Sequence, residues 1–215
     1  MSQIIQSQYI ENILNRDELI IFTKLQKIIY QINKITNLTR LIEGDGFWIS
    51  QVYDSIWPFL NNSEKIFDGK KFIDIGSGCG FPGLAYSITH PNSEVYLVDS
   101  SRKKTDALKE IVKALNIKNK IYIINDRIEK LAHNSIYRNN FDIGTIRAVG
   151  SPSTVTEYLL PMLNKDGRGL LYCGKWTKED ENKIQNSLNI LKGSIQQIKT
   201  TYLPKDRGER NVIFI

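Results

Sequence analysis

The sequence is poor in the residues that build metal centres and disulfide frameworks. Its two cysteines, Cys79 and Cys173, lie far apart and belong to no CxxC pair, and His90 and His133 are the only histidines. We therefore expect reduced thiols and no metal site. No run of about 18 apolar residues is present, which argues against a membrane span.

The first residues also lack the basic and apolar segments of a secretory signal, so we expect a cytoplasmic protein. Hydrophobic residues make up 41% and charged residues 24% of the 215 residues, as in ordinary globular proteins. This length suits one large domain, with or without an N-terminal extension. We expect a monomer. The net charge of +6 permits a polyanionic partner such as RNA but does not require one.

The most informative stretch is Lys71 to Gly83, KFIDIGSGCGFPG. Its first five residues are typical of a buried parallel strand, and Asp74 stands near the end of that strand. Four glycines follow within eight residues, and Pro82 suits the first turn of a helix. The order strand, glycine loop and helix predicts a nucleotide-type site at the helix N-terminus.

Different cofactors use such loops. A Walker A loop ends in Gly-Lys-Ser/Thr, but the first lysine after these glycines is Lys103, which argues against a P-loop ATP site. Residues 78–83 fit G-x-G-x-x-G, which keeps NAD open. Counted from Gly76, however, the last position of that motif is Phe81. The pattern D-x-G-x-G-x-G, with Asp74 as its acid, favours S-adenosylmethionine.

From residue 70 onward, strands and helices alternate, which predicts a mostly parallel α/β sheet with helices on both faces. The expected strands span residues 72–75, 94–98, 120–124, 141–146 and 169–173, and two more lie near 195–203 and 211–215. The last two are joined by a turn short enough for an antiparallel hairpin. The expected helices span 82–90, 103–115, 154–163 and 178–192, with a short one from Arg127.

Residues 1–60 have apolar side chains at helical spacing, which predicts a helical extension packed on a main domain of residues 61–215. A second helix within it carries residues 47–57. Its Trp48 and Trp57 could stack on bases, but aromatic residues at this spacing more often pack a helix against its domain. We therefore interpret both as packing residues.

Polar residues follow the expected strands at the edge where ligands bind in open α/β sheets. Asp99 ends the second strand, where an acid accepts hydrogen bonds from ribose hydroxyls or caps the next helix. Residues 125–129 either flank an adenine or cap a short helix. Arg147 ends the fourth strand and has three open roles: holding a carboxylate, holding a phosphate, or a salt bridge to Asp74 or Glu129.

Several motifs in one order resemble a known family. They are residues 37–39 (NLT), 54–55 (DS), 74–83 (DIGSGCGFPG), 97–100 (LVDS), 103–104 (KK), 147–148 (RA) and 208–210 (GER). The chain resembles the ribosomal RNA small subunit methyltransferase G family, also called glucose-inhibited division protein B. The resemblance implies methyl transfer from S-adenosylmethionine to N7 of a guanine in 16S rRNA. It also implies a seven-stranded Rossmann-like domain with a helical N-terminal extension.

The resemblance implies the following cofactor-binding residues: Gly76, Gly78, Phe81, Asp99, Ser100, Ser101, Ile128, Glu129 and Arg147. Under this reading no general base is expected, because guanine N7 carries no proton. The RNA-binding candidates are Arg207, Arg210, Lys205, Lys199 and Arg40. The chain departs from the family pattern at Gln51, Ile146 and Cys173, where histidine, serine and lysine are frequent.

Three other activities remain open. A SAM-dependent enzyme of a small molecule or protein would act without RNA. An NAD-dependent oxidoreductase would bind NADH. A non-catalytic RNA-binding module would bind RNA without the cofactor, although the intact glycine loop and Asp99 argue against it.

Overall fold

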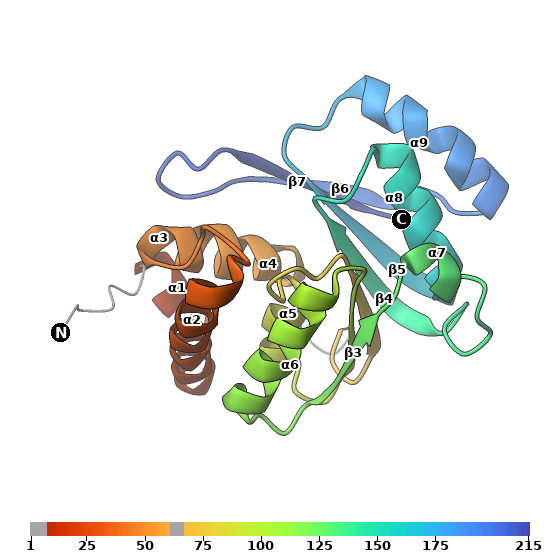
Figure 1. Ribbon diagram of the computed structural model, residues 1–215. Helices are drawn as coiled ribbons and strands as arrows, with labels where there is room; N and C mark the ends of the chain where they lie inside the picture. The colour runs from red at the N-terminus through yellow and green to blue at the C-terminus, as the bar shows by residue number, and fades with distance from the viewer. Residues whose placement is uncertain (1–7, 61–66) are drawn as a thin grey trace.

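The computed structural model describes residues 8–60 and 67–215 and is built around one seven-stranded sheet (Figure 1). The strands are β1 (Lys71–Ile75), β2 (Glu94–Asp99), β3 (Lys120–Asn125), β4 (Phe141–Arg147), β5 (Leu163–Cys173), β6 (Gln197–Tyr202) and β7 (Glu209–Phe214). Their order is β3-β2-β1-β4-β5-β7-β6, and β7 alone runs in the direction opposite to the other strands of this sheet. The predicted α/β sheet and its C-terminal hairpin are confirmed.

Helices cover both faces of the sheet. The N-terminal region contributes α1 (Gln8–Glu11), α2 (Arg16–Thr36), α3 (Gly44–Phe47), the π-helical η1 (Trp48–Tyr53), α4 (Asp54–Ile56) and the 3-10 turn η2 (Trp57–Phe59). The remaining helices are α5 (Gly83–Thr89), α6 (Arg102–Leu115), α7 (Ile128–Leu131), α8 (Pro152–Leu159), α9 (Lys178–Leu191) and the 3-10 turn η4 (Leu160–Met162).

The two faces of the sheet carry separate parts of the core, because successive side chains of a strand point to opposite sides. Phe72 of β1 packs in a cluster with residues of α2, α5 and α6. Ile73 and Ile75 belong to a second cluster with residues of α7, α8 (Pro152–Leu159) and α9. We call the side covered by α2, α5 and α6 the first face and the side covered by α7, α8 and α9 the second face (Figure 1).

The N-terminal helices belong to the first face. Helix α2 begins at a capping box of Asn15 and Glu18, and its buried side chains include Phe22 and Leu25 at helical spacing. It packs against α5 and α6. The division at residue 60 stays a prediction, and its boundary meets residues 61–66, which lie outside the described residues.

Trp48 and Trp57 are both buried, at 0% and 8% exposure, which confirms the packing interpretation. The helix expected over residues 47–57 is interrupted by the π-helical η1 and ends in a 3-10 turn that contains Pro58. Proline removes a backbone donor and thereby limits a regular helix at that point.

Strand β5 is longer than expected, because it begins at Leu163 and not at residue 169. Its polar stretch of residues 164–168 has no apolar alternation that would predict a strand. A register shift between Phe141 and Ile143 of β4 accommodates this stretch. The preceding helix ends correspondingly earlier, at Leu159, followed by a 3-10 turn with Pro161.

Candidate functional site

The glycine loop, which follows β1, lies against the carboxyl end of β2. The amides of Gly76 and Ser77 both donate to the Val98 carbonyl, at 2.8 and 3.0 Å. Gly76, Gly78 and Gly80 all have positive φ angles, which glycine adopts without strain. A Cβ on Gly83 would lie 2.3 Å from Leu97 and 2.9 Å from Asp74, so only glycine lets α5 start this close to the sheet.

Asp74 fastens the start of α5 to the centre of the sheet. Its side chain is fully buried, and its Oδ2 accepts a hydrogen bond from the Gly83 amide at 3.0 Å. Its Oδ1 accepts from the Thr145 hydroxyl at 2.9 Å. Burial raises the pKa of Asp74 to about 6. Asp74, the acid of the D-x-G-x-G-x-G pattern, therefore holds the glycine loop in place through its hydrogen bonds. Its side chain does not line the cavity that this loop borders.

Asp99 connects the glycine loop to the next helix. Its Oδ2 accepts from the Gly78 amide at 3.0 Å and its Oδ1 accepts from the Ser101 amide at 2.9 Å. The Lys104 ammonium lies 3.7 Å from the same carboxylate. An ionised carboxylate offers about four acceptor positions. Asp99 can therefore organise the loop and still accept hydrogen bonds from a ribose.

A second group of lining residues comes from beyond β3. Ile128 is buried, and Glu129 accepts a hydrogen bond from the Tyr158 hydroxyl at 2.7 Å. A backbone amide and this hydroxyl hold the pKa of Glu129 below its usual value. An apolar side chain beside ordered polar groups suits the edge of a planar heterocycle.

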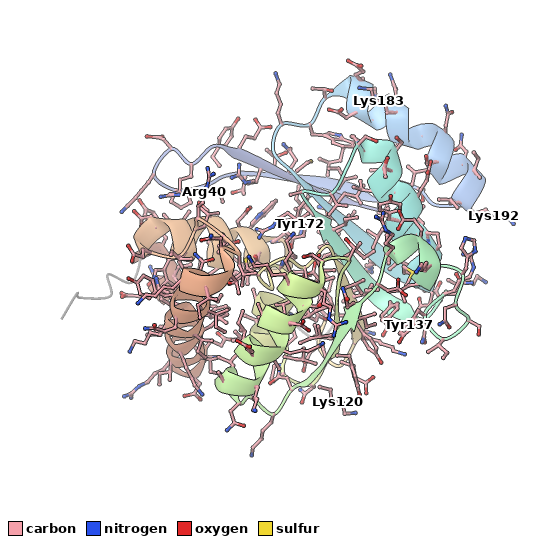
Figure 2. The ribbon with its side chains drawn as sticks, in the orientation of Figure 1. Arg40, Lys120, Tyr137, Tyr172, Lys183 and Lys192 are labelled. Atoms are coloured by element: carbon pink, nitrogen blue, oxygen red, sulfur yellow. The ribbon has the colours of Figure 1, made fainter. Side chains whose placement is uncertain are left out.

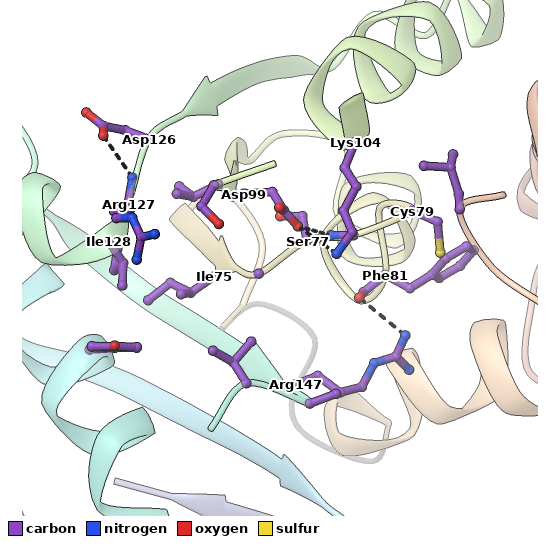
Figure 3. Close-up of a pocket in the computed structure, with 18 of the residues that line it drawn as sticks. Ile75, Ser77, Cys79, Phe81, Asp99, Lys104, Asp126, Arg127, Ile128 and Arg147 are labelled. Carbon is purple, nitrogen blue, oxygen red and sulfur yellow. Dashed lines mark hydrogen bonds and ion pairs between the residues drawn. The ribbon is translucent and has the colours of Figure 1, made fainter. Parts of the chain in front are cut away.

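Arg147 lies at the opposite end of the cavity from Ile128 (Figure 3). Its Nη2 donates to Gln51 Oε1 at 2.7 Å and to the Phe81 carbonyl at 3.3 Å. Its Nη1 pairs with Asp54 at 3.4 Å. Of the three roles left open for Arg147, a salt bridge is present, but its carboxylate is Asp54 of the N-terminal helices and neither Asp74 nor Glu129.

Asp54 is buried and also pairs with Arg210, at 3.4 Å. Burial raises its pKa, and the two arginines oppose this rise. Gln51 extends the same cluster, because its Nε2 donates to Thr39 Oγ1 at 3.2 Å. The N-terminal helices, the glycine loop and the end of β4 therefore meet around one guanidinium.

One cavity of about 440 Å³ gathers eight of the nine expected cofactor residues. They are Gly76, Gly78, Phe81, Asp99, Ser100, Ile128, Glu129 and Arg147. Ser101 is not among the lining residues. It is the N-cap residue of α6, and its backbone amide donates a hydrogen bond to Asp99, which lines the cavity.

Among the lining residues to which the sequence interpretation gave no role are Leu38, Thr39, Lys104 and Tyr158. The first three stand in motifs that carried the family resemblance, so that pattern could have found them. Tyr158 had no comparable signal, because it lies within an amphipathic helix.

The RNA-binding candidates of the hairpin make contacts within the protein. Lys205 pairs with Asp45 at 2.7 Å, Arg207 donates to Ser50 at 2.9 Å, and Arg210 pairs with Asp54. Lys199 donates to the Pro58 carbonyl at 3.1 Å. These contacts fasten the β6–β7 hairpin to the N-terminal helices. Arg40, in contrast, is exposed (Figure 2).

Two features are absent from the described ranges 8–60 and 67–215. No helix there has the length and apolar character to cross a membrane. No group of three or more metal-ligating side chains gathers there.

Solved methyltransferases share this fold. An O-methyltransferase from Bacillus cereus, solved in complex with SAH, aligns with a TM-score of 0.64 at 13% identity and covers 97% of this chain and 96% of its own. A tRNA methyltransferase from Bacillus subtilis aligns with a TM-score of 0.56 at 14% identity over 77% of this chain and 64% of its own. The fold is therefore the Rossmann-like fold of SAM-dependent methyltransferases.

The family model of rRNA small subunit methyltransferase G matches residues 19–212. A ribosomal RNA small subunit methyltransferase G of Prochlorococcus marinus subsp. pastoris is 62% identical over 95% of this chain and 85% of its own length. Another from Prochlorococcus marinus strain NATL1A is 43% identical over 90% of this chain and 78% of its own. The chain belongs to the rRNA small subunit methyltransferase G family.

Proposed function

We propose that this protein transfers the methyl group of S-adenosylmethionine to N7 of a guanine in 16S rRNA, acting in the cytoplasm as a monomer. Family membership supports methylation of small-subunit rRNA. The observation that carries the proposal is the single cavity in which the glycine loop, Asp99 and Arg147 come together.

The cavity residues fit S-adenosylmethionine along its length. The Ile128–Glu129 end would hold the adenine, with Asp99 accepting hydrogen bonds from the ribose hydroxyls. The glycine loop and Arg147 would hold the methionine part, whose carboxylate suits a guanidinium. Bound there, the cofactor supplies an electrophilic methyl group on a sulfonium.

The reaction at guanine N7 requires no proton transfer by the protein. N7 carries a lone pair and no proton, so the new nitrogen–carbon bond forms as the sulfur–carbon bond breaks, and sulfur keeps the electron pair. The side chains then contribute alignment and exclusion of water. This agrees with a cavity whose lining carboxylates all accept hydrogen bonds from the protein: Asp99 from the Gly78 amide, Asp126 from the Arg127 amide and Glu129 from the Tyr158 hydroxyl.

The target base should enter beside Leu38, Thr39 and Arg147. All three line the cavity; Gln51 joins Thr39 to Arg147 by hydrogen bonds, and Arg147 lies away from Ile128 (Figure 3), which is assigned to the adenine. The base must be unstacked to reach such a cavity. A guanine in a loop, or one extruded from a helix, is therefore the expected substrate.

The test is incubation with labelled S-adenosylmethionine and either naked 16S rRNA or small ribosomal subunits from a strain that lacks the gene. Digestion to nucleosides should place the label in 7-methylguanosine. The better of the two substrates shows whether the protein recognises naked RNA or the assembled particle. Bovine serum albumin and a mixture of free nucleosides serve as acceptors that should stay unlabelled.

Label in another nucleoside would refute the N7 assignment and keep the rRNA activity. Absence of label in both RNAs, with cofactor binding retained in calorimetry, would refute the rRNA substrate in favour of a non-RNA acceptor. RNA binding without cofactor binding would identify a non-catalytic RNA-binding module. Each outcome separates one of the alternatives from the proposal.

A further inference from the structure

We propose that the exposed cations of α2 and α6 form the surface on which the phosphate backbone of the RNA lies while its base is in the cavity. This inference rests on the proposed function and deepens it. It moves the main phosphate contacts away from the β6–β7 hairpin. We call this surface the basic face.

Charge is distributed unevenly between the two sides of the sheet. Helix α2 carries four basic and two acidic residues, and α6 carries five basic and two acidic ones. On the second face, α8 and α9 together carry two basic and four acidic residues. The excess positive charge of the helices is therefore concentrated on the first face.

Three cations of α6 are ion-paired, because Arg102 and Lys109 lie by Asp106 and Lys104 lies by Asp99. Six other exposed cations, on these helices or just beyond α2, have neither an ion pair nor a side-chain hydrogen bond among the described residues: Arg16, Lys27, Lys34, Arg40, Lys103 and Lys113. The lysines of α9 differ, because Lys178 and Lys183 pair with Glu181 and Glu179. The hairpin cations are already committed to Asp45, Ser50 and Asp54. The basic face thus keeps charge that is not neutralised by the protein.

The two helices form one continuous surface. Helix α2 packs against α6, and the Lys24 ammonium donates to the Leu115 carbonyl at the end of α6 at 2.6 Å. The 21 residues of α2 give a length of about 30 Å. A shallow groove along α2 is lined by Arg16, Leu19, Ile20, Thr23, Lys24 and Lys27. This shape and charge suit an extended polyanion.

The basic face leads to the cavity. Leu38 and Thr39, which follow the end of α2, line it, and so does Lys104 in the first turn of α6. One end of the cavity is therefore bordered by the segment after α2 and by the first turn of α6. A strand laid along them would bring its nucleotides to the end of the cavity assigned to the target base. Phosphate contacts of this kind position a nucleic acid without reading its sequence.

The test compares two triple variants. One carries Lys27→Gln, Lys103→Gln and Lys113→Gln on the basic face. Its matched control carries Lys178→Gln and Lys183→Gln on α9 and Lys192→Gln at the C-cap of that helix, on the other side of the sheet (Figure 2). Binding of each variant to fluorescently labelled small ribosomal subunits and to naked 16S rRNA is measured between 50 and about 300 mM salt.

The basic-face variant should bind RNA about tenfold to a hundredfold more weakly near physiological salt, with a salt slope reduced by roughly two to three. The α9 variant should bind like the original protein. Calorimetry should show unchanged cofactor binding in both, because none of the six lysines lines the cavity. Unchanged cofactor binding also shows that both variants are folded.

Equal RNA affinity and equal salt slopes in all three proteins would overturn the basic face as the RNA surface. So would a basic-face variant that loses binding to anionic phospholipid vesicles but not to RNA. Failure of the proposed function is distinguishable, because it appears as absence of 7-methylguanosine with the unaltered protein.

Discussion

The two faces of the sheet differ in what covers them. The first face has a core rich in aromatic residues, including Phe22, Phe47, Trp48 and Tyr86, and carries the N-terminal helices. The second face is covered by α7, α8 and α9 over a mainly aliphatic core in which Phe141 is the only fully buried aromatic residue among those described. The N-terminal helices, α1 to η2, thus form an additional layer on one side of a methyltransferase sheet. We call them the added layer.

This asymmetry extends to the cavity. The first face supplies the glycine loop, Leu38, Thr39 and Lys104, whereas the second face contributes Ile128, Glu129 and Tyr158. Under the proposed function, the end that receives the target base is built with the added layer, and the end that would hold the adenine belongs to the part of the fold shared with other methyltransferases. We therefore expect substrate recognition to depend on the first face.

The largest effect is expected where the added layer meets the sheet. Phe22→Ala should lower the free energy of unfolding by about 3 to 5 kcal/mol, because it leaves a cavity at a fully buried site. Ile35→Ala on the same helix is the control, since Ile35 is 84% exposed. Calorimetry should show one transition that shifts as a whole. A separate early transition would show that residues 1–60 unfold independently of the main domain.

A smaller effect is expected in the pH dependence of stability. The pKa of Asp74 is about 6 in the folded protein against 3.8 for an ordinary Asp. The folded state therefore binds the proton more tightly, and this group's contribution to stability falls as pH rises from about 4 to about 6. The loss is on the order of 3 kcal/mol.

The variant Asp74→Asn should lack this fall. Its amide can keep both contacts, since the Thr145 hydroxyl can accept a hydrogen bond as well as donate one. Urea unfolding at a series of pH values measures the difference. The exposed Asp166→Asn is the control and should retain the original profile. An identical profile for both variants would contradict the assignment to Asp74.

The close approach of α5 to the sheet predicts a steric effect of about 1 to 3 kcal/mol for Gly83→Ala. The new Cβ would meet Leu97 and Asp74, and the displaced glycine loop should lose most of its affinity for S-adenosylmethionine. Gly174→Ala is the matched control, because nothing lies within 4 Å of its Cβ position. Thermal unfolding and calorimetry with the cofactor measure both consequences. Equal cofactor affinity in the two variants would contradict the role of the loop.

The smallest effect is expected on the second face. Tyr158→Phe removes the hydrogen bond to Glu129 and keeps the ring, so cofactor binding should weaken by about 0.5 to 1.5 kcal/mol, which is up to roughly tenfold. Calorimetry with S-adenosylmethionine measures this change. RNA binding should not change, because the basic face lies on the other side. Weaker RNA binding in this variant would contradict the division of roles between the faces.

Local sequence predicted the elements of the sheet and the residues at its strand ends. Asp99, Ile128 and Arg147 line the cavity because the carboxyl ends of parallel strands meet at one edge. The pairing of Arg147 with Asp54 could not be predicted in this way. It joins residues 93 positions apart through the packing of the added layer, which no local pattern specifies.

The same limit applies to the hairpin. Arg207 and Arg210 stand in a polar turn, where surface exposure is the natural expectation. Their actual partners, Ser50 and Asp54, are 157 and 156 positions away. Charge in the sequence indicates how many cations a protein has, but only the fold shows which of them are neutralised.

The strand order has a consequence for the synthesis of this protein. Strand β7 is translated after β6, yet it lies between β5 and β6 in the sheet. Until β7 leaves the ribosome, β6 has no neighbour in the sheet and β5 remains an open edge. The sheet of the nascent chain therefore stays incomplete until the last strand has been synthesised. Exposed strand edges of this kind promote aggregation, so truncation before β7 should leave the chain dependent on chaperones.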